Sequence, residues 1–484
     1  MRISGRPGGL RAARSRADAG LLVTIAAVVL LACAVLSGMT AVVASATVEA
    51  AGAVVASAAG PAGAVRVSAP APDAPGLDGS VRAALADRFA GIPVAVTRTV
   101  ETQPTPLALP ASESGSGSGS GSGSPSSPTS AVLLADETIA SHAVLVSGSW
   151  LDGSAGGAGS GGSGGAGSVV VQADAAAALG LAVGSPVALG SGGASFTVVG
   201  TWRAADPLDP VWLGEPGPAS GSQAGAAGPF VVSESDLLAL PVSATTRWTV
   251  TVPAAGGQAG GLTASEVEAL PGAADRTGIA GAIALRGDTT SAGLTVTGDL
   301  SATATRARTG MTSAQSLALV PTVLVGVLAL IGLSRLAGLL AGRRRSADAL
   351  LSARGAAPAQ FARWSAVEGV LVTVPAGVVG SALGLGIAWL LRGGPAALAP
   401  EVLVTPAILI TVAALGVGTV AVLVASGVAG VRADAAERSG RPRTAGTVVA
   451  GAAVAVLAVV AGLAVWQLEL AAGAGAGAGG AGAG

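Results

Sequence analysis

This 484-residue chain contains no Lys, one Cys and one His, and each scarcity excludes a class of site. Because all 26 basic residues are Arg, the chain lacks the loop in which a Lys reaches the β- and γ-phosphates of ATP. If ATP drives this protein, another polypeptide must bind and hydrolyse it. With a single Cys, neither an internal disulfide nor a cysteine metal site can form within the chain.

A single His leaves no recognisable catalytic set. The sequence places no serine and carboxylate around His142 at the geometry of a nucleophilic site, so a His on the surface or in a loop is the simpler interpretation. The acidic stretch with Asp206, Asp209 and Glu215 could in principle ligate a hard cation. Its intervening Pro, Leu, Val and Trp residues lack the dense oxygen spacing of a calcium loop, which favours a structural turn. We therefore expect no catalytic residues, no metal and no bound cofactor in this chain, which would then not be an enzyme.

Charged residues are also scarce, at 11% of the chain, whereas 51% of residues are hydrophobic and the mean hydropathy is +0.68. These values place the chain among membrane proteins. The net charge of −1 gives no reason to expect nucleic acid as a partner. Cys33, in the sequence LLAC, could mark a lipoprotein signal. However, residues 34–46 stay apolar where a lipidated Cys should open a polar tether, so a plain membrane helix is favoured.

Five apolar segments are long enough to cross a hydrocarbon core of about 30 Å at about 1.5 Å per residue. The second contains Arg335, whose long side chain can reach the interface. In the third, Gly380 and Gly384 either permit close helix packing or reflect the general Gly richness of the chain. The cores of the other four have no charge, which argues against an ion-coupled carrier. The predicted spans are residues 21–46, 316–341, 366–391, 402–431 and 447–466.

The distribution of Arg orients these spans. Arg is concentrated before the first span (residues 1–20), between the second and third (342–365) and between the fourth and fifth (432–446). The positive-inside rule places these three segments in the cytoplasm. The region 47–312 instead has 20 Asp and Glu against 10 Arg, which places it outside. We expect a multi-pass protein of a bacterial cell membrane with a cytoplasmic N-terminus.

The expected fold is a membrane α-helical protein of about five spans, with a large extracellular α+β domain between the first two. Short alternating runs bounded by Gly or Pro predict strands, and capping patterns such as Ser233 with Asp236 predict helices. Two Gly/Ser-rich tracts, 114–124 and 156–168, cannot bury enough apolar surface to order, so we expect disordered loops there. The predicted strands are 94–100, 168–172, 196–202, 230–232, 247–252 and 294–297, and the predicted helices are 174–179, 233–240 and 263–270.

A short amphipathic segment separates the second and third spans. Ser346 can cap a helix whose first turn carries Asp348, and Arg354 followed by Gly355 can end that helix. Pro358 suits the first turn of a second helix that continues into the third span. The segment is either a solvated hairpin on the lipid headgroups or an element that presses two Leu residues against a cytoplasmic partner.

At these residues the chain resembles a known family. The stretch RRRSADALLSARGAAPAQFARWSAVEG is similar to the cytoplasmic segment of FtsX-like (MacB/LolC-type, type VII) ABC transporter permeases. ADAAAALGLAVGSPVAL, FTVVGTWRAADPLDPVWLG and RWTVTVP resemble the outside domain of long members, although Ser185 departs from the usual Asp. Asp348 stands where the family often has Glu. The resemblance implies a set of ATPase-coupling residues: Arg343, Arg344, Arg345, Asp348, Leu350, Leu351, Arg354, Gly355, Phe361 and Glu368.

The resemblance implies a permease subunit that pairs with a separate cytoplasmic ABC ATPase, which binds the ATP. Such a subunit would transmit helix movement to the outside domain in the export or release of a lipoprotein, a peptide or another envelope cargo. A fifth span and a Gly/Ala-rich tail, 471–484, follow the four spans of a half-transporter. We therefore expect either the N-terminal half of a duplicated permease, with a second half or a homodimer as partner, or a short protein with an outer tail.

Two other classes of function remain. One is a membrane-anchored extracellular binding or regulatory protein without transport. The other, an anchored extracellular hydrolase, is the least supported because no catalytic set is visible in the sequence.

Overall fold

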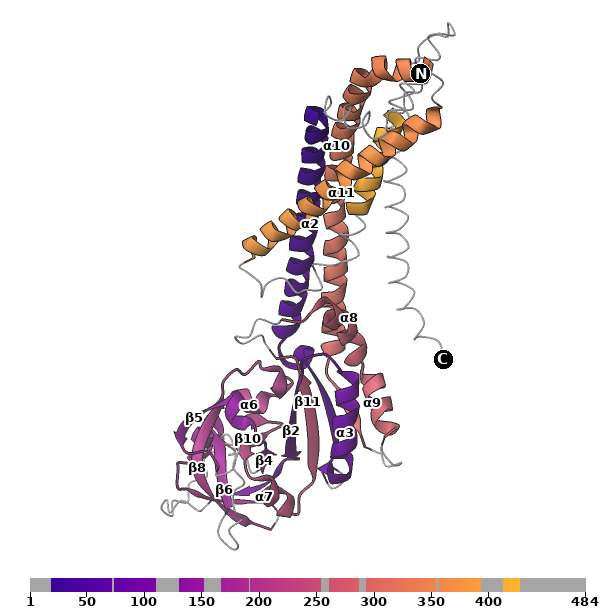
Figure 1. The fold of residues 1–484 in the computed structure, drawn as a ribbon. Helices are drawn as coiled ribbons and strands as arrows, with labels where there is room; N and C mark the ends of the chain where they lie inside the picture. The colour runs from indigo at the N-terminus through magenta and orange to yellow at the C-terminus, as the bar shows by residue number, and fades with distance from the viewer. Residues whose placement is uncertain are drawn as a thin grey trace. The chain divides into compact units, whose positions relative to one another are not determined.

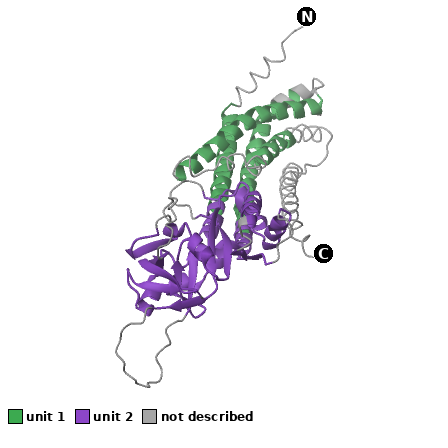
Figure 2. Ribbon diagram, turned by 90° about the horizontal axis from the view of Figure 1, so that it is seen from below, with its two compact units in different colours: residues 1–47, 312–484 green, residues 48–311 purple. Residues whose placement is uncertain are grey.

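The computed structural model of the chain describes residues 19–71, 74–109, 130–151, 167–190, 192–253, 261–286, 293–353, 357–392 and 412–426. The chain divides into two compact units (Figure 2). Unit 1 comprises Met1–Thr47 and Thr312–Gly484, and unit 2 comprises Val48–Met311.

Three helices in the described part of the chain are long and apolar enough to cross a membrane (Figure 1). They are α2 (Ala19–Ala56), α10 (Leu300–Ala353) and α11 (Pro358–Leu391). The first three predicted spans lie inside these helices. The fourth, 402–431, overlaps a shorter apolar helix, Val412–Ser426. The remainder of the fourth span, the fifth span, the loop 432–446 and the tail 471–484 lie outside the described residues.

The core of unit 1 is built around α2. One face of α2 packs against the other helices, whereas large apolar side chains such as Leu31, Leu324 and Leu371 stay exposed on the outer faces. An apolar surface on both sides of a helix is typical of a helix that lies in lipid. The buried residues of this core include Ile25, Val29, Cys33 and Leu36 of α2, Leu330, Leu333 and Ala337 of α10, Ala376 of α11, and Leu415 and Val422.

Glycines bring α2 and α11 into backbone contact. A Cβ atom added to Gly380 would lie 2.3 Å from the carbonyl oxygen of Leu30, and one added to Gly384 would lie 2.1 Å from that of Ala34. Neither distance is sterically possible, so any larger residue would push the helices apart. Of the two interpretations of Gly380 and Gly384, the structure therefore favours close helix packing over general Gly richness.

We predict that this packing can be trapped by a disulfide. A Cβ atom at Gly377 of α11 would lie 3.8 Å from the Sγ atom of Cys33, near enough for a thiol on that carbon to reach Cys33 after a rotation of the Cys33 side chain. Because Cys33 is the only natural Cys, Gly377→Cys should form one intramolecular disulfide under mild oxidation, measured as the loss of both thiols to alkylation. Gly386→Cys is the control, because nothing lies within 4 Å of its Cβ position. Equal thiol loss in both variants would contradict this packing.

Unit 2 is organised on one mixed sheet, and four of its strands form an antiparallel sheet in the order β12-β1-β11-β2. These strands are β1 (Ala64–Pro70), β2 (Ala95–Thr102), β11 (Ala244–Thr251) and β12 (Thr295–Thr297). Helix α3 (Ala74–Arg88) links β1 to β2, and α8 (Ala264–Ala273) and α9 (Arg276–Ala284) link β11 to β12. Two β-α-β units interleaved in this order are a ferredoxin-like arrangement.

One face of this sheet is covered by the helices (Figure 1). Val65, Val67, Trp248 and Val250 point into the core and alternate along their strands with polar residues on the opposite face. The end of α2 and the first turns of α10 belong to this core as well. The helical residues of the core include Ala51, Val55, Val81, Leu85, Val267, Leu270, Ile279, Ile283, Leu300, Ala304 and Ala307.

The chain between β2 and β11 closes into a ring of six strands. The pairings run β4-β3-β7-β8-β6-β10 and return to β4, with β4/β10 and β6/β8 parallel. Closure leaves no strand edge in the ring exposed. The strands are β3 (Thr105–Ala108), β4 (Ser130–Ala135), β6 (Gly167–Gln172), β7 (Pro186–Leu189), β8 (Ala194–Ala204) and β10 (Ala226–Val231), with β5 (Ala143–Gly148) paired to β8 and β9 (Ser222–Gln223) to β10.

The interior of the ring is apolar. Its buried residues include Leu133, Val169, Val171, Leu189, Phe196, Val198 and Phe230. Strand β2 pairs with β4, so the ring continues the four-stranded sheet.

All six predicted strands and all three predicted helices of the α+β region are present. Helix α7 (Glu234–Ala239) is capped by Ser233, whose side chain accepts a hydrogen bond from the amide of Asp236, as predicted. Thr263 and Glu266 form a reciprocal capping box on α8. Strands β1, β3, β4, β5, β7 and β9 were not predicted. Strand β4 is buried on both faces and therefore shows no alternation of polar and apolar residues.

The disordered loop predicted for the Gly/Ser-rich tract 156–168 extends too far, because it runs into a strand. Its last two residues, Gly167 and Ser168, belong to strand β6. A Cβ atom at Gly167 would lie 2.4 Å from the ring of Phe196, so this glycine admits the aromatic side chain of the neighbouring strand. The remainder of this tract and the whole of 114–124 lie outside the described residues.

Candidate functional site

The predicted coupling segment lies at the end of α10 and the start of α11. Ser346 does not cap a new helix, because α10 continues through it to Ala353. The residues around it are Arg, Ala and Leu, which favour helix and give α10 no reason to stop. Helix α11 begins at Pro358, and this proline therefore lies in the first turn of the helix, as predicted. Arg354 and Gly355 lie outside the described residues.

A buried ion pair joins the two helices of this segment. Arg344 of α10 donates through both terminal nitrogens to Glu368 of α11, with Nη1 2.5 Å from Oε2 and Nη2 2.8 Å from Oε1. Arg344 is buried, and Glu368 is about three-quarters buried. A bidentate charge-assisted pair of this kind fixes both distance and orientation. The two residues were predicted only as members of one coupling set, and the structure makes them each other's partner.

The other members of the predicted coupling set point in two directions. Phe361 is buried and contacts the ring of Trp364 edge to face, at 5.7 Å between ring centroids. Arg343 and Arg345 are exposed, as is Leu350, with 68% of its surface accessible. Arg344, Phe361 and Glu368 thus face inward, whereas Arg343, Arg345 and Leu350 are available at the surface. The side chains of Asp348 and Leu351 lie outside the described part of the chain.

We predict that Arg344→Ala destabilises the chain by roughly 2–4 kcal/mol, because it leaves Glu368 partly buried without its cation. The double variant Arg344→Met with Glu368→Leu should recover most of this loss, since it removes both charges. Thermal unfolding of the full chain in detergent measures both effects. Arg343→Ala, at an exposed neighbour, is the control and should have little effect. A double variant as unstable as Arg344→Ala would contradict the assignment.

Unit 2 contains a second charged cluster, which sequence reasoning missed. Arg66 of β1 donates to Glu215 at 2.6 Å, to the carbonyl of Val211 at 2.8 Å and to the hydroxyl of Thr249 at 3.0 Å. Arg247 of β11 donates to the same oxygen of Glu215 at 2.9 Å and also to Glu101 of β2. Two arginines and two glutamates therefore form one network.

This network lies on the face of the four-stranded sheet that the helices leave uncovered. The segment η3 (Pro210–Trp212) to α6 (Pro216–Ser220) brings Glu215 over that face, and Gln223 of β9 donates to Glu101 at 2.9 Å. Because these residues are up to 183 positions apart, no local sequence pattern could pair them. The network connects the sheet to the segment between β8 and β10.

Burial controls the charge of Glu101. Only 7% of its surface is exposed, and desolvation, reinforced by the neighbouring Glu215, raises its pKa to about 7 against the opposing effect of Arg247 and Arg66. Desolvation likewise lowers the pKa of Arg66. Because an arginine cannot lose its proton in a protein, the ionised glutamates are what balance the two cations.

We predict a pH-dependent stability that traces to Glu101. Its folded pKa lies above that of an unfolded glutamate, so the folded state binds the proton more tightly. The contribution of Glu101 to stability should therefore fall as pH rises from about 4.5 to about 7 and then level off, by roughly 3 kcal/mol at most. Measured by thermal unfolding between pH 4.5 and 8, the wild type and the control Glu268→Gln, at an exposed position, should both show this slope relative to Glu101→Gln. A wild-type stability that rises over this range relative to Glu101→Gln would overturn the assignment.

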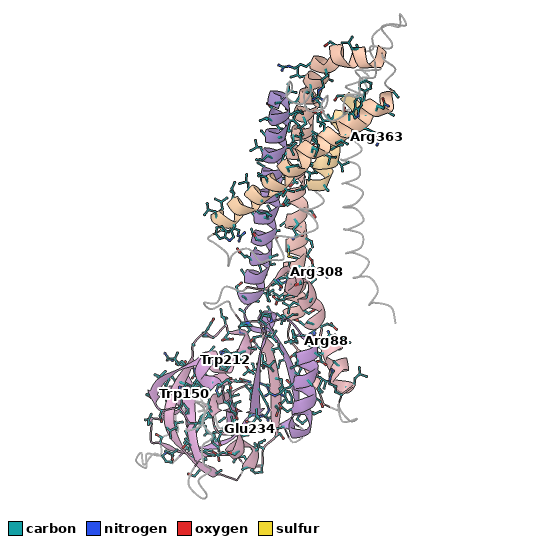
Figure 3. All side chains as sticks on the ribbon, viewed as in Figure 1. Arg88, Trp150, Trp212, Glu234, Arg308 and Arg363 are labelled. Atoms are coloured by element: carbon teal, nitrogen blue, oxygen red, sulfur yellow. The ribbon has the colours of Figure 1, made fainter. Side chains whose placement is uncertain are left out.

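His142 is partly exposed at the surface and ends a short helix, so it does not lie in a loop. It is the last residue of a short helix, α4 (Ile139–His142), with 24% of its side chain accessible. Its Nδ1 lies 3.1 Å from Asp209, which raises the pKa of the imidazole, and its ring lies 6.4 Å from Trp212, labelled in Figure 3. Both partners pack His142 into the fold. We assign it a structural role.

The acidic stretch is a turn, as predicted. Asp206 accepts a hydrogen bond from the amide of Leu208, and Asp209 caps η3 by accepting from the amide of Val211. Glu215 turns away to the arginine network. Within the described residues, no three or more His, Cys, Asp or Glu side chains are grouped so that they could hold a metal ion.

Comparison with known proteins gives no assignment for this chain. It matches no family model and no curated protein.

Proposed function

We propose that this chain is the membrane subunit of an ABC transporter, in which a separate cytoplasmic ATPase drives movement of an extracellular α+β domain. The sequence resemblance to FtsX-like permeases is the starting point. In the proposed arrangement five spans cross the cell membrane, with the Arg-rich segments in the cytoplasm and unit 2 outside.

The observation that carries the proposal is the continuity of α10. One uninterrupted helix of 54 residues contributes Leu300 and Ala304 to the core of unit 2, and Leu330 and Leu333 to the core of unit 1. It ends at the predicted coupling segment. A displacement at that end can be transmitted along the helix, because backbone hydrogen bonds hold its turns except for the one that Pro321, which has no N–H group, cannot donate.

The coupling end of α10 has the properties that a mechanical contact needs. The Arg344–Glu368 pair fixes the first helix to the second, so a force on the segment moves both helices together. Leu350, Arg343 and Arg345 remain at the surface, where a partner can contact them. Leu350 is the residue we assign to ATPase docking, and Arg344 and Glu368 are the residues that stiffen the segment.

We predict that Leu350→Asp abolishes capture of the ATPase while leaving the chain folded. Tagged full-length protein, extracted in detergent, would be isolated and its bound proteins identified by mass spectrometry. A stoichiometric ATPase is expected with the wild type and at least tenfold less with Leu350→Asp, since a charge in an apolar contact costs several kcal/mol. Leu285→Asp, at an exposed Leu of unit 2, is the matched control and should retain the ATPase. Undiminished capture by Leu350→Asp would exclude this residue as the docking contact.

A membrane-anchored binding or regulatory protein is the second candidate. It is favoured by the closed ring of unit 2, a rigid body that could present loops to an envelope partner without any movement. The same isolation experiment separates the two candidates, because this one predicts envelope proteins and no ATPase.

A further inference from the structure

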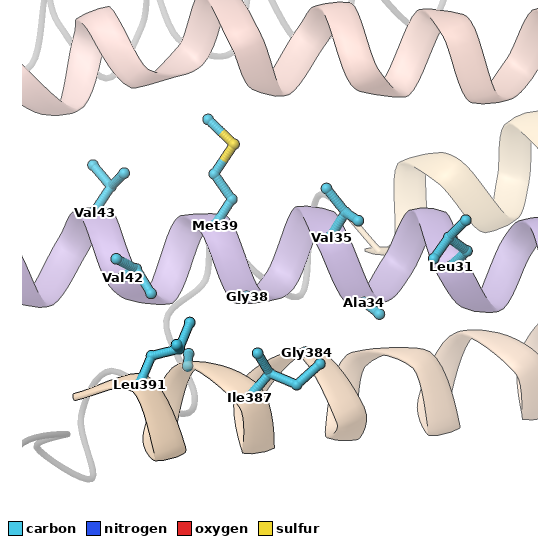
Figure 4. Close-up of a pocket in the computed structure, with 11 residues that line it drawn as sticks. Leu31, Ala34, Val35, Gly38, Met39, Val42, Val43, Gly384, Ile387 and Leu391 are labelled. Carbon is cyan, nitrogen blue, oxygen red and sulfur yellow. The ribbon is translucent and has the colours of Figure 1, made fainter. Parts of the chain in front are cut away.

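An apolar groove lies between α2 and α11 within unit 1 (Figure 4). Its volume of about 380 Å³ falls in the range of small-ligand sites. All of its lining residues are apolar, and Leu31, Val35, Ile387 and Leu391 are among them. The contact of Gly38 with the backbone of Gly384 holds the two helices close along the groove.

The length of the groove corresponds to one leaflet of a bilayer. On α2 the lining residues run from Leu31 to Val43. At about 1.5 Å per residue they span roughly 18 Å, slightly more than half of a hydrocarbon core of about 30 Å. A groove of this length fits one extended acyl chain.

A positive charge stands at one end of the groove. Arg392 follows Leu391, the last groove residue of α11, and its Nη1 donates to the carbonyl of Val42 at 3.2 Å and to the hydroxyl of Ser45 at 2.7 Å. The guanidinium is therefore held at the end of the groove that Val42 and Leu391 line. The exposed Trp389, one turn earlier, is a residue typical of the membrane interface. Charge and aromatic ring together mark the headgroup level.

We infer that the α2–α11 groove binds one membrane phospholipid with an anionic headgroup, its acyl chain along Leu31, Val35 and Ile387 and its phosphate beside Arg392. This inference rests on the membrane insertion proposed above and is independent of ATPase coupling. A lipid held there would fill the surface beside the glycine contact and stabilise the packing of α2 on α11.

Native mass spectrometry of the full chain in detergent tests the inference. Phosphatidylglycerol and phosphatidylcholine with identical acyl chains are the two probes. The wild type should bind phosphatidylglycerol more tightly, and Arg392→Gln should weaken that binding about fivefold. The same variant should weaken the binding of phosphatidylcholine much less, because the choline cation offsets the charge of its phosphate. Arg392→Lys should keep the preference because it keeps the charge. Equal binding of the two lipids by the wild type would overturn the inference.

Three further variants separate the groove from a general effect on folding. Val35→Trp fills the groove and should weaken both lipids, whereas Val378→Trp, at an exposed position of α11 outside the groove, should weaken neither. Ser45→Ala removes a hydrogen bond of Arg392 but not its charge, so it should keep the lipid preference. Loss of the preference in Ser45→Ala would mean that Arg392 acts structurally and would overturn its role. A change of oligomeric mass in Val35→Trp, with lipid binding unchanged, would identify the groove as a contact between copies.

Loss of lipid binding and loss of the ATPase are separate results. An ATPase captured by a chain that shows no lipid preference would overturn the lipid site alone. Lipid binding without ATPase capture would overturn the transporter proposal alone.

Discussion

A buried guanidinium cannot give up its charge, and the long-range connections of this protein depend on how that constraint is met. In unit 1, Arg344 binds Glu368 and joins α10 to α11. In unit 2, Arg66 and Arg247 share Glu215 and join the sheet to the segment between β8 and β10. A chain without Lys has only this permanently charged group for its buried cations, so each one requires a carboxylate in a defined place.

The same constraint makes these clusters points of organisation in the fold. Each glutamate accepts from an arginine that keeps its proton, and therefore its charge, in the folded protein. What the pairs provide is orientation. Arg98 and Glu234 repeat the arrangement between β2 and α7, with two hydrogen bonds of 2.8 and 2.6 Å; Glu234 is labelled in Figure 3. Three bidentate or shared arginine–glutamate contacts thus hold elements that are distant in sequence.

Glycine has the complementary role in the apolar helices, where no charge is available to fix a contact. Backbone approach at Gly380 and Gly384 sets the spacing of α2 and α11, and the same spacing leaves the apolar groove beside Leu31. The proposed transmission along α10 and the proposed lipid site both rely on helices that keep a fixed spacing. A helix pair held by backbone contact gives that property without polar groups in the membrane.

The sequence by itself determined the apolar spans that lie in α2, α10 and α11, the α+β character of unit 2 and the start of α11 at Pro358, because periodicity, length and capping act within one element. It also selected a turn for the acidic stretch. It could not predict β4, which lacks alternation, or the continuation of α10 past Ser346. Only the tertiary structure decided that Arg344 meets Glu368, that Arg66 meets Glu215 and that Gly384 meets Ala34. Those contacts join residues 24 to 350 positions apart, and chain folding, not local preference, brings them together.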